Sequence, residues 1–121
     1  MLFRVDPSSA VALGDQIAAA VRGAIADGSL HAGERLPAGR ELAASLGVNV
    51  HTVLRGYQRL KEEGLIELRR GRGAVVTDAV SPGRARLGEA AERLIAEARR
   101  LGLSDDEIVG VVRTGLGLAG N

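Results

Sequence analysis

The sequence predicts a mainly α-helical protein with one small β-hairpin, and three features support this prediction. Aromatic residues make up only 2% of the 121 residues, so the core has to be aliphatic, which suits helices better than a β-sandwich. Apolar residues recur at helical spacing along most of the chain. Residues 65–77 differ, because two short β-type runs there flank the glycine-rich segment Arg-Gly-Arg-Gly, a pattern typical of a hairpin.

Three helices are expected before the hairpin, over residues 10–27, 39–46 and 49–63. The first follows the helix-start signal Pro-Ser-Ser at residues 7–9, and each carries an apolar stripe. Gly47 suits the end of the second helix, and Asn49 is a good N-cap for the third. Two helices joined by so short a turn have the length and turn chemistry of a helix-turn-helix. A hairpin after them makes the predicted domain a winged helix-turn-helix.

Two further helices are expected after the hairpin. Ser81 and Pro82 supply an N-cap and a first-turn proline for a helix of about four turns. Ser104 and Glu107 form a capping-box pattern for the last helix. The apolar positions of the two helices are Leu87, Ala91, Leu94, Ile95, Ala98, Leu101, Ile108, Val111 and Val112. Because a two-helix appendage cannot bury both apolar faces alone, the sequence predicts a homodimer through this region.

The expected organisation is therefore a winged helix-turn-helix domain over residues 1–78 and a short two-helix dimerisation region over residues 79–121. The chain has no cysteine and only two histidines, and no cluster of metal ligands or triad candidates is evident. Neither an enzyme nor a cofactor or metal site is expected. Since no apolar run is long enough to cross a bilayer and no signal pattern is evident, a cytoplasmic protein without a membrane partner is expected.

The polar face of the third helix is the first candidate for contact with DNA. His51, Thr52 and Arg55 lie on the side opposite Val53 and Tyr57, near the N-terminal end, where a recognition helix contacts base edges. Arginine can pair with guanine through two hydrogen bonds, and threonine offers a methyl group and a hydroxyl. A polar helix face is by itself more often simply solvated, so this interpretation depends on the neighbouring hairpin.

The hairpin tip is the second candidate. Arg70 and Arg72 alternate with Gly71 and Gly73, and glycine allows the backbone to approach a phosphate closely. An arginine at such a tip can enter a narrow minor groove, where the negative potential is enhanced. The alternative is a plain solubilising turn. A dinucleotide-binding loop is rejected, because the glycines lie between two β-type runs and a third glycine is absent.

Arg40 is the third candidate, at the start of the second helix. There it could hold a phosphate beside a helix N-terminus that already favours anions. The alternative role is a surface salt bridge with Glu34 or Glu41.

These segments together resemble the GntR family of bacterial regulators. The resemblance covers about half of the chain, roughly residues 16–77, and rests on the segments LPAGRELA (36–43), LGVNVHTV (46–53), YQRL (57–60), EGLI (63–66) and RGRG (70–73). The run Val-Asn-x-x-Thr-Val looks most like the YtrA-type subfamily, whose members have a short C-terminal region of about two helices. Ala38 departs from the family, which usually has serine there, so one cap or phosphate contact is missing.

The resemblance implies a role for each candidate residue: Arg40 grips the DNA backbone, the start of the third helix reads the operator, and the wing tip reaches the minor groove. The predicted DNA-binding residues are Arg40, Asn49, His51, Thr52, Arg55, Arg70, Arg72 and Gly73. The expected function is a sequence-specific regulator, a repressor, that binds a (pseudo)palindromic operator in double-stranded DNA as a homodimer. A winged-helix protein-interaction module is the alternative, against which the wing arginines argue. Whether a small-molecule effector binds stays an open question, because no constellation of polar groups marks a site for one.

Overall fold

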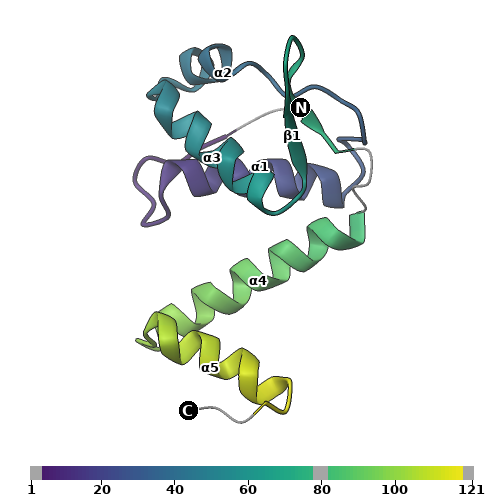
Figure 1. Cartoon of the computed structure of the whole chain (residues 1–121). Coiled ribbons are helices and arrows are strands. Elements are labelled where there is room, and N and C mark those ends of the chain that lie inside the picture. The colour runs from purple at the N-terminus through teal and green to yellow at the C-terminus, as the bar shows by residue number, and fades with distance from the viewer. Residues whose placement is uncertain (1–3, 78–81, 119–121) are drawn as a thin grey trace. The chain divides into compact units, whose positions relative to one another are not determined.

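The computed structural model describes residues 4–77 and 82–118. Its elements are α1 (Leu13–Ala26), α2 (Gly39–Leu46), α3 (Val50–Glu62), β1 (Ile66–Arg69), β2 (Gly73–Val76), α4 (Pro82–Arg100) and α5 (Asp105–Gly115) (Figure 1). This order confirms the predicted mainly α fold with one hairpin. The chain divides into two compact units, Met1–Glu89 and Ala90–Asn121, so the division falls within α4. The predicted domain boundary at residue 78 and the predicted cap Ser81 lie outside the described residues.

The core of the first unit is aliphatic, as the low aromatic content predicts. Its fully buried centre includes Ile17, Val21, Val53, Leu60 and Val76, which come from α1, α3 and β2. The axes of α1 and α3 approach closely, because both helices have a glycine at their contact. A Cβ atom at Gly56 would lie only 2.7 Å from the backbone oxygen of Gly14. Any larger residue at that contact would therefore push the two helices apart.

The connector between α1 and α2 joins the small sheet. β1 and β2 pair antiparallel, with Ile66 opposite Val76. Arg35 forms an isolated antiparallel bridge with Val75, the Leu36 amide donates to the Ala74 carbonyl at 2.8 Å, and the Val76 amide donates to the Glu34 carbonyl at 2.8 Å. These bonds satisfy the outer edge of β2, and Leu36 is buried beneath it. The connector is therefore an ordered part of the wing.

Among the helix ends that the structure describes, the start of the first helix differs from the prediction. This helix begins at Leu13 rather than at residue 10, and its N-cap Ala12 makes no side-chain cap bond. The Ser8 hydroxyl instead donates to the Asp6 carboxylate, and the Ser9 hydroxyl accepts a hydrogen bond from the Val11 amide. The serines that looked like a helix start thus form a turn before the helix, because a serine side chain bonds equally well to the backbone of a tight turn.

The predicted caps at Gly47, Asn49 and Ser104, which lie within the described residues, are confirmed. The Asn49 side chain accepts a hydrogen bond from the His51 amide at 2.8 Å and so caps α3. Gly47 ends α2 in the left-handed region at a φ of 69°. Ser104 and Glu107 form the complete capping box at the start of α5. Ala38, where a serine would cap α2, makes no side-chain bond.

The second unit consists of the later part of α4 and α5. Ala98 and Ile108 are buried, and the Leu103 amide donates to the Ala98 carbonyl at 3.1 Å where the chain turns between the helices. Most other large apolar side chains of this unit are exposed, including Leu101 at 77%. Among the described residues, no helix is both long and apolar enough to cross a membrane.

Candidate DNA interface

The outer face of α3 carries the predicted recognition residues. His51 and Arg55 are exposed, and Thr52 is half-buried beside the first turn of α1. Thr52 and Arg55 border a depression of about 360 Å³ whose other wall includes Leu13 and Gly14. Asn49 is exposed as well, but its side-chain oxygen already caps the helix. The structure therefore assigns Asn49 a local structural role beside the predicted contact with DNA.

The inner face of α3 holds the helix in place against the connector. The Tyr57 hydroxyl donates a hydrogen bond to the Pro37 carbonyl at 2.7 Å. Burial raises the pKa of Tyr57 to about 12, so the hydroxyl stays protonated and able to donate at neutral pH. This bond joins the middle of α3 to Pro37 and thereby links α3 to the connector directly before α2.

The described arginines divide into those with acidic partners and those without. Arg22 and Arg59 form ion pairs with Glu63 and Asp15, at 2.7 and 2.9 Å. Arg69, next to the hairpin tip, pairs with Glu67 at 2.9 Å. The predicted DNA-binding arginines differ from these, since none of them forms an ion pair within the described residues: Arg40, Arg55, Arg70 and Arg72.

Arg40 in particular does not form the salt bridge that was the alternative to a role in DNA binding. Glu34 instead accepts hydrogen bonds from the His31 amide at 2.9 Å and from the His31 ring at 2.6 Å. The bond from this amide contributes most to holding the Glu34 pKa below its usual value. No bond joins Arg40 to Glu41 among the described residues. The exposed Arg40 guanidinium is therefore available to an external anion at the start of α2.

The hairpin tip has the geometry that its glycines predict. Gly71 and Gly73 have φ angles of 80° and 75°, which glycine adopts without strain. The Arg72 amide donates to the Arg69 carbonyl at 3.0 Å and closes the turn. Arg70 and Arg72 are both exposed. In Figure 1 this loop and α2 lie at the same upper edge of the first unit.

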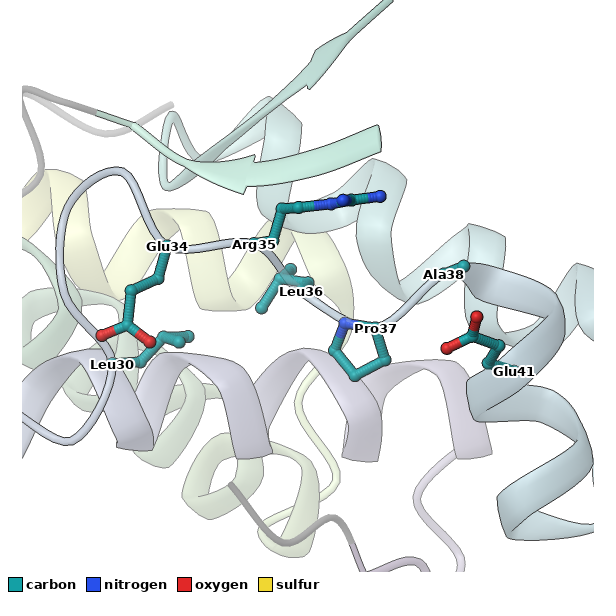
Figure 2. Close-up of a pocket in the computed structure, with 7 residues that line it drawn as sticks. All are labelled: Leu30, Glu34, Arg35, Leu36, Pro37, Ala38 and Glu41. Atoms are coloured by element: carbon teal, nitrogen blue, oxygen red, sulfur yellow. The ribbon is translucent and has the colours of Figure 1, made fainter. Parts of the chain in front are cut away.

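A second depression, which sequence reasoning did not find, lies along the connector and has a volume of about 400 Å³. Figure 2 shows Glu34 at one end and Glu41 at the other, with Leu36 and Pro37 between them. The two carboxylates do not converge on one point, and negative charge disfavours phosphate. No cluster of three metal-binding side chains occurs in the described ranges. Neither observation favours a ligand site here. The depression exists because the connector packs against the rest of the unit, and the sequence alone does not show this packing.

The chain is similar to known transcription regulators over most of its length. The family model described as "Bacterial regulatory proteins, gntR family" matches residues 13–76. The HTH-type transcriptional regulator Rv1152 of Mycobacterium tuberculosis is 36% identical over 105 residues, which are 87% of this chain and 86% of that protein. The transcriptional repressor YtrA of Bacillus subtilis is 34% identical over 77 residues, or 64% of this chain and 59% of that protein.

Solved structures support the same assignment. YtrA from Sulfolobus acidocaldarius, a GntR-family transcription factor, is 36% identical with a TM-score of 0.62, and the match covers 79% of this chain and 99% of that one. The DNA-binding domain of AraR, solved in complex with the operator ORX1, is 26% identical with a TM-score of 0.54, over 63% of this chain and 93% of that domain. The matched family region contains α1, α2, α3 and both strands, and thus every predicted DNA-binding residue. This chain therefore belongs to the gntR family of bacterial regulatory proteins and is a DNA-binding transcription regulator rather than an enzyme.

Proposed function

We propose that this protein is a transcription repressor that binds a (pseudo)palindromic operator as a homodimer. In the proposed complex, α3 enters the major groove and the hairpin tip reaches the adjacent minor groove. The observation that carries the proposal is the division of the arginines. Arg22, Arg59 and Arg69 pair with carboxylates. Four exposed arginines form no ion pair within the described residues: Arg40 on α2, Arg55 on α3, and Arg70 and Arg72 at the hairpin tip. Exposed cations without internal partners are what phosphate contacts require.

Each group has a distinct role in this proposal. Arg40 binds a backbone phosphate and thereby positions α3. His51, Thr52 and Arg55 face the base edges, where an arginine can donate two hydrogen bonds to guanine. The tip, with Arg70, Arg72 and Gly73, lies in the minor groove, where Arg72 is the inserted cation. Because the ligand is chromosomal DNA, the proposal places the protein in the cytoplasm.

The second unit supports the homodimer. Its exposed large apolar side chains are Leu94, Leu101, Val109, Val111, Val112, Leu116 and Leu118. So many exposed apolar groups in one small unit exceed the scattered exposure that is ordinary for a monomer, and a second copy would cover them. Two winged helices held in this way would read half-sites about one helical turn, roughly 34–36 Å, apart. The repressor role is supported by the similarity to the Bacillus protein, which is named a repressor.

In vitro selection from random duplex DNA with the full chain, at near-physiological salt, tests the proposed function. Enrichment of a palindrome is the expected outcome, and its half-site spacing reports the geometry of the dimer. Enrichment of a single half-site would contradict the homodimer but not the DNA-binding role. Failure to enrich any sequence would favour a protein-interaction module instead.

Replacing Arg72 with alanine is expected to weaken binding to all sequences alike. The loss of a cation from the groove should make log K fall less steeply with log salt concentration, by about one unit of slope per protomer. Arg55→Ala should instead cost about 1–3 kcal/mol at particular base pairs and relax the preference there. The binding constants of both variants are measured by fluorescence anisotropy, on several DNA sequences and at several salt concentrations.

The control for these two variants is the loss of one arginine charge far from the proposed interface in the sequence. Arg100 is exposed in the second unit and pairs with Glu97 at 2.7 Å, so Arg100→Ala should leave affinity and salt slope unchanged. An unchanged slope for Arg72→Ala would remove the wing from the interface. Equal weakening on every sequence for Arg55→Ala would make Arg55 a backbone contact.

Leu94→Glu is expected to dissociate the homodimer at micromolar concentration, because a carboxylate would have to be buried in an apolar interface. Leu94 is partly exposed, at 36%, so the monomer can accept the change without loss of its own core. Ala96→Glu is the control, since Ala96 is exposed on another side of α4. Sedimentation velocity gives the oligomeric state. A Leu94→Glu protein that still sediments as a dimer would place the interface elsewhere.

A further inference from the structure

One exposed leucine stands out on the outer face of α3. Leu54 is 47% exposed and is the only exposed large apolar side chain on this helix, all of which is described. Its neighbours on the same face are His51 and Gln58, one turn away on either side, and Arg55 beside it; all three are exposed. The apolar group thus lies at the centre of the face that is proposed to enter the major groove.

The Leu54 side chain is also held in position. A Cβ atom at Gly39 would lie 3.1 Å from Leu54 Cδ2 and 3.8 Å from Val50 Cγ2. The isobutyl group therefore packs over the bare backbone at the start of α2, which a larger residue than glycine would obstruct. One side of the leucine contacts α2, and the other side faces outward. A side chain already ordered in this way loses little entropy when a ligand covers it.

A protein partner is a poor explanation for this leucine. Protein-binding patches have apolar centres made of several side chains, whereas the exposed neighbours of Leu54 on α3 are polar or cationic. Single exposed leucines are common on protein surfaces, but this one lies between the groups that suit base edges. In the major groove, the apolar group available to an aliphatic side chain is the C5-methyl group of thymine.

We propose that Leu54 is a specificity-determining residue that contacts a thymine C5-methyl group in each operator half-site. This inference rests on the proposed function, because it requires α3 to lie in the major groove. It adds an apolar contact beside the hydrogen bonds of Arg55 and Thr52. The recognised feature is the methyl group itself, so the contact distinguishes thymine from uracil, which forms the same base pair.

Synthetic operators that lack single methyl groups test the proposal. In the palindrome obtained by selection, each thymine is replaced in turn by deoxyuridine, symmetrically in both half-sites. Affinities of the full chain are measured by fluorescence anisotropy. The wild-type protein should lose about four-fold per half-site at one thymine, as expected when one buried methyl group is removed. Leu54→Ala should bind the unmodified operator more weakly and show no loss at that thymine.

Arg55→Ala is the matched control, because it should lower affinity yet keep the full dependence on the methyl group. Leu54 is outside the core but packs over Gly39, so Leu54→Ala should lower the melting temperature only slightly and remain fully folded at the assay temperature, and this is checked first. The proposal is overturned if no thymine shows a dependence on its methyl group, if the half-site contains no thymine, or if Leu54→Ala keeps the dependence unchanged. Failure of selection to yield any operator would instead overturn the proposed function, and this contact with it.

Discussion

Gly56→Ala is expected to lower the free energy of unfolding of the first unit by about 1–3 kcal/mol. The added Cβ atom would lie 2.7 Å from the Gly14 backbone oxygen and 3.2 Å from the Ile17 side chain. A backbone oxygen cannot rotate away, so α1 and α3 have to separate and the core between them loosens. The higher helix propensity of alanine, about 1 kcal/mol, offsets only part of this cost.

Gly23→Ala is the control for this substitution. Gly23 also lies inside a helix of the same unit, but a Cβ atom there would meet only the Glu89 carboxylate, at an ordinary 3.5 Å. This variant should be neutral or more stable by up to about 1 kcal/mol. Urea unfolding followed by circular dichroism measures both changes. Equal stability of the two variants would show that α1 and α3 can accommodate a Cβ atom at Gly56 without a loss of stability.

Glu63→Ala is expected to have a larger effect, about 3–5 kcal/mol. Glu63 receives two hydrogen bonds from Arg22, at 2.8 Å from Nε and 2.7 Å from Nη2. The Arg22 side chain is only 2% exposed, and a Cβ atom at Gly88 would lie 2.8 Å from its Cδ. Removal of the carboxylate would leave a buried guanidinium without its partner, with little room to turn toward water.

Glu62→Ala is the matched control, since it removes the same side chain from the preceding residue. Glu62 is exposed, so its loss should change the free energy of unfolding by no more than about 0.5 kcal/mol. The readout is the urea midpoint at an unchanged m-value. If Glu63→Ala were as mild as its control, water would have to reach Arg22 in the folded protein.

The local features of this fold could be predicted from the sequence because each depends on a few neighbouring residues. The Asn49 cap, the turn at Gly47 and the capping box of Ser104 require only short-range bonds, and the structure has all three. The exposure of Arg70 and Arg72 follows from a glycine-rich turn in the same way. The start of α1 was predicted wrongly, because a short serine-containing segment can cap a helix or form a separate turn.

The contacts between distant segments could not be predicted in this way. Arg22 and Glu63 are 41 residues apart, and no local pattern identifies one as the partner of the other. The same holds for the bond between Tyr57 and the Pro37 carbonyl. The separation of arginines that stabilise the fold from those available to DNA therefore required the structure.

The sequence by itself determined the order of the elements, the helix-turn-helix, the glycine-rich wing and the family, because periodicity, capping and turn chemistry are properties of short segments. Only the tertiary structure decided how closely α1 meets α3, how the connector around Arg35 completes the wing and which side of Leu54 is covered. These features depend on the separation of atoms in space between segments that are distant in the chain. Side-chain packing and hydrogen bonding set those separations once the chain has folded.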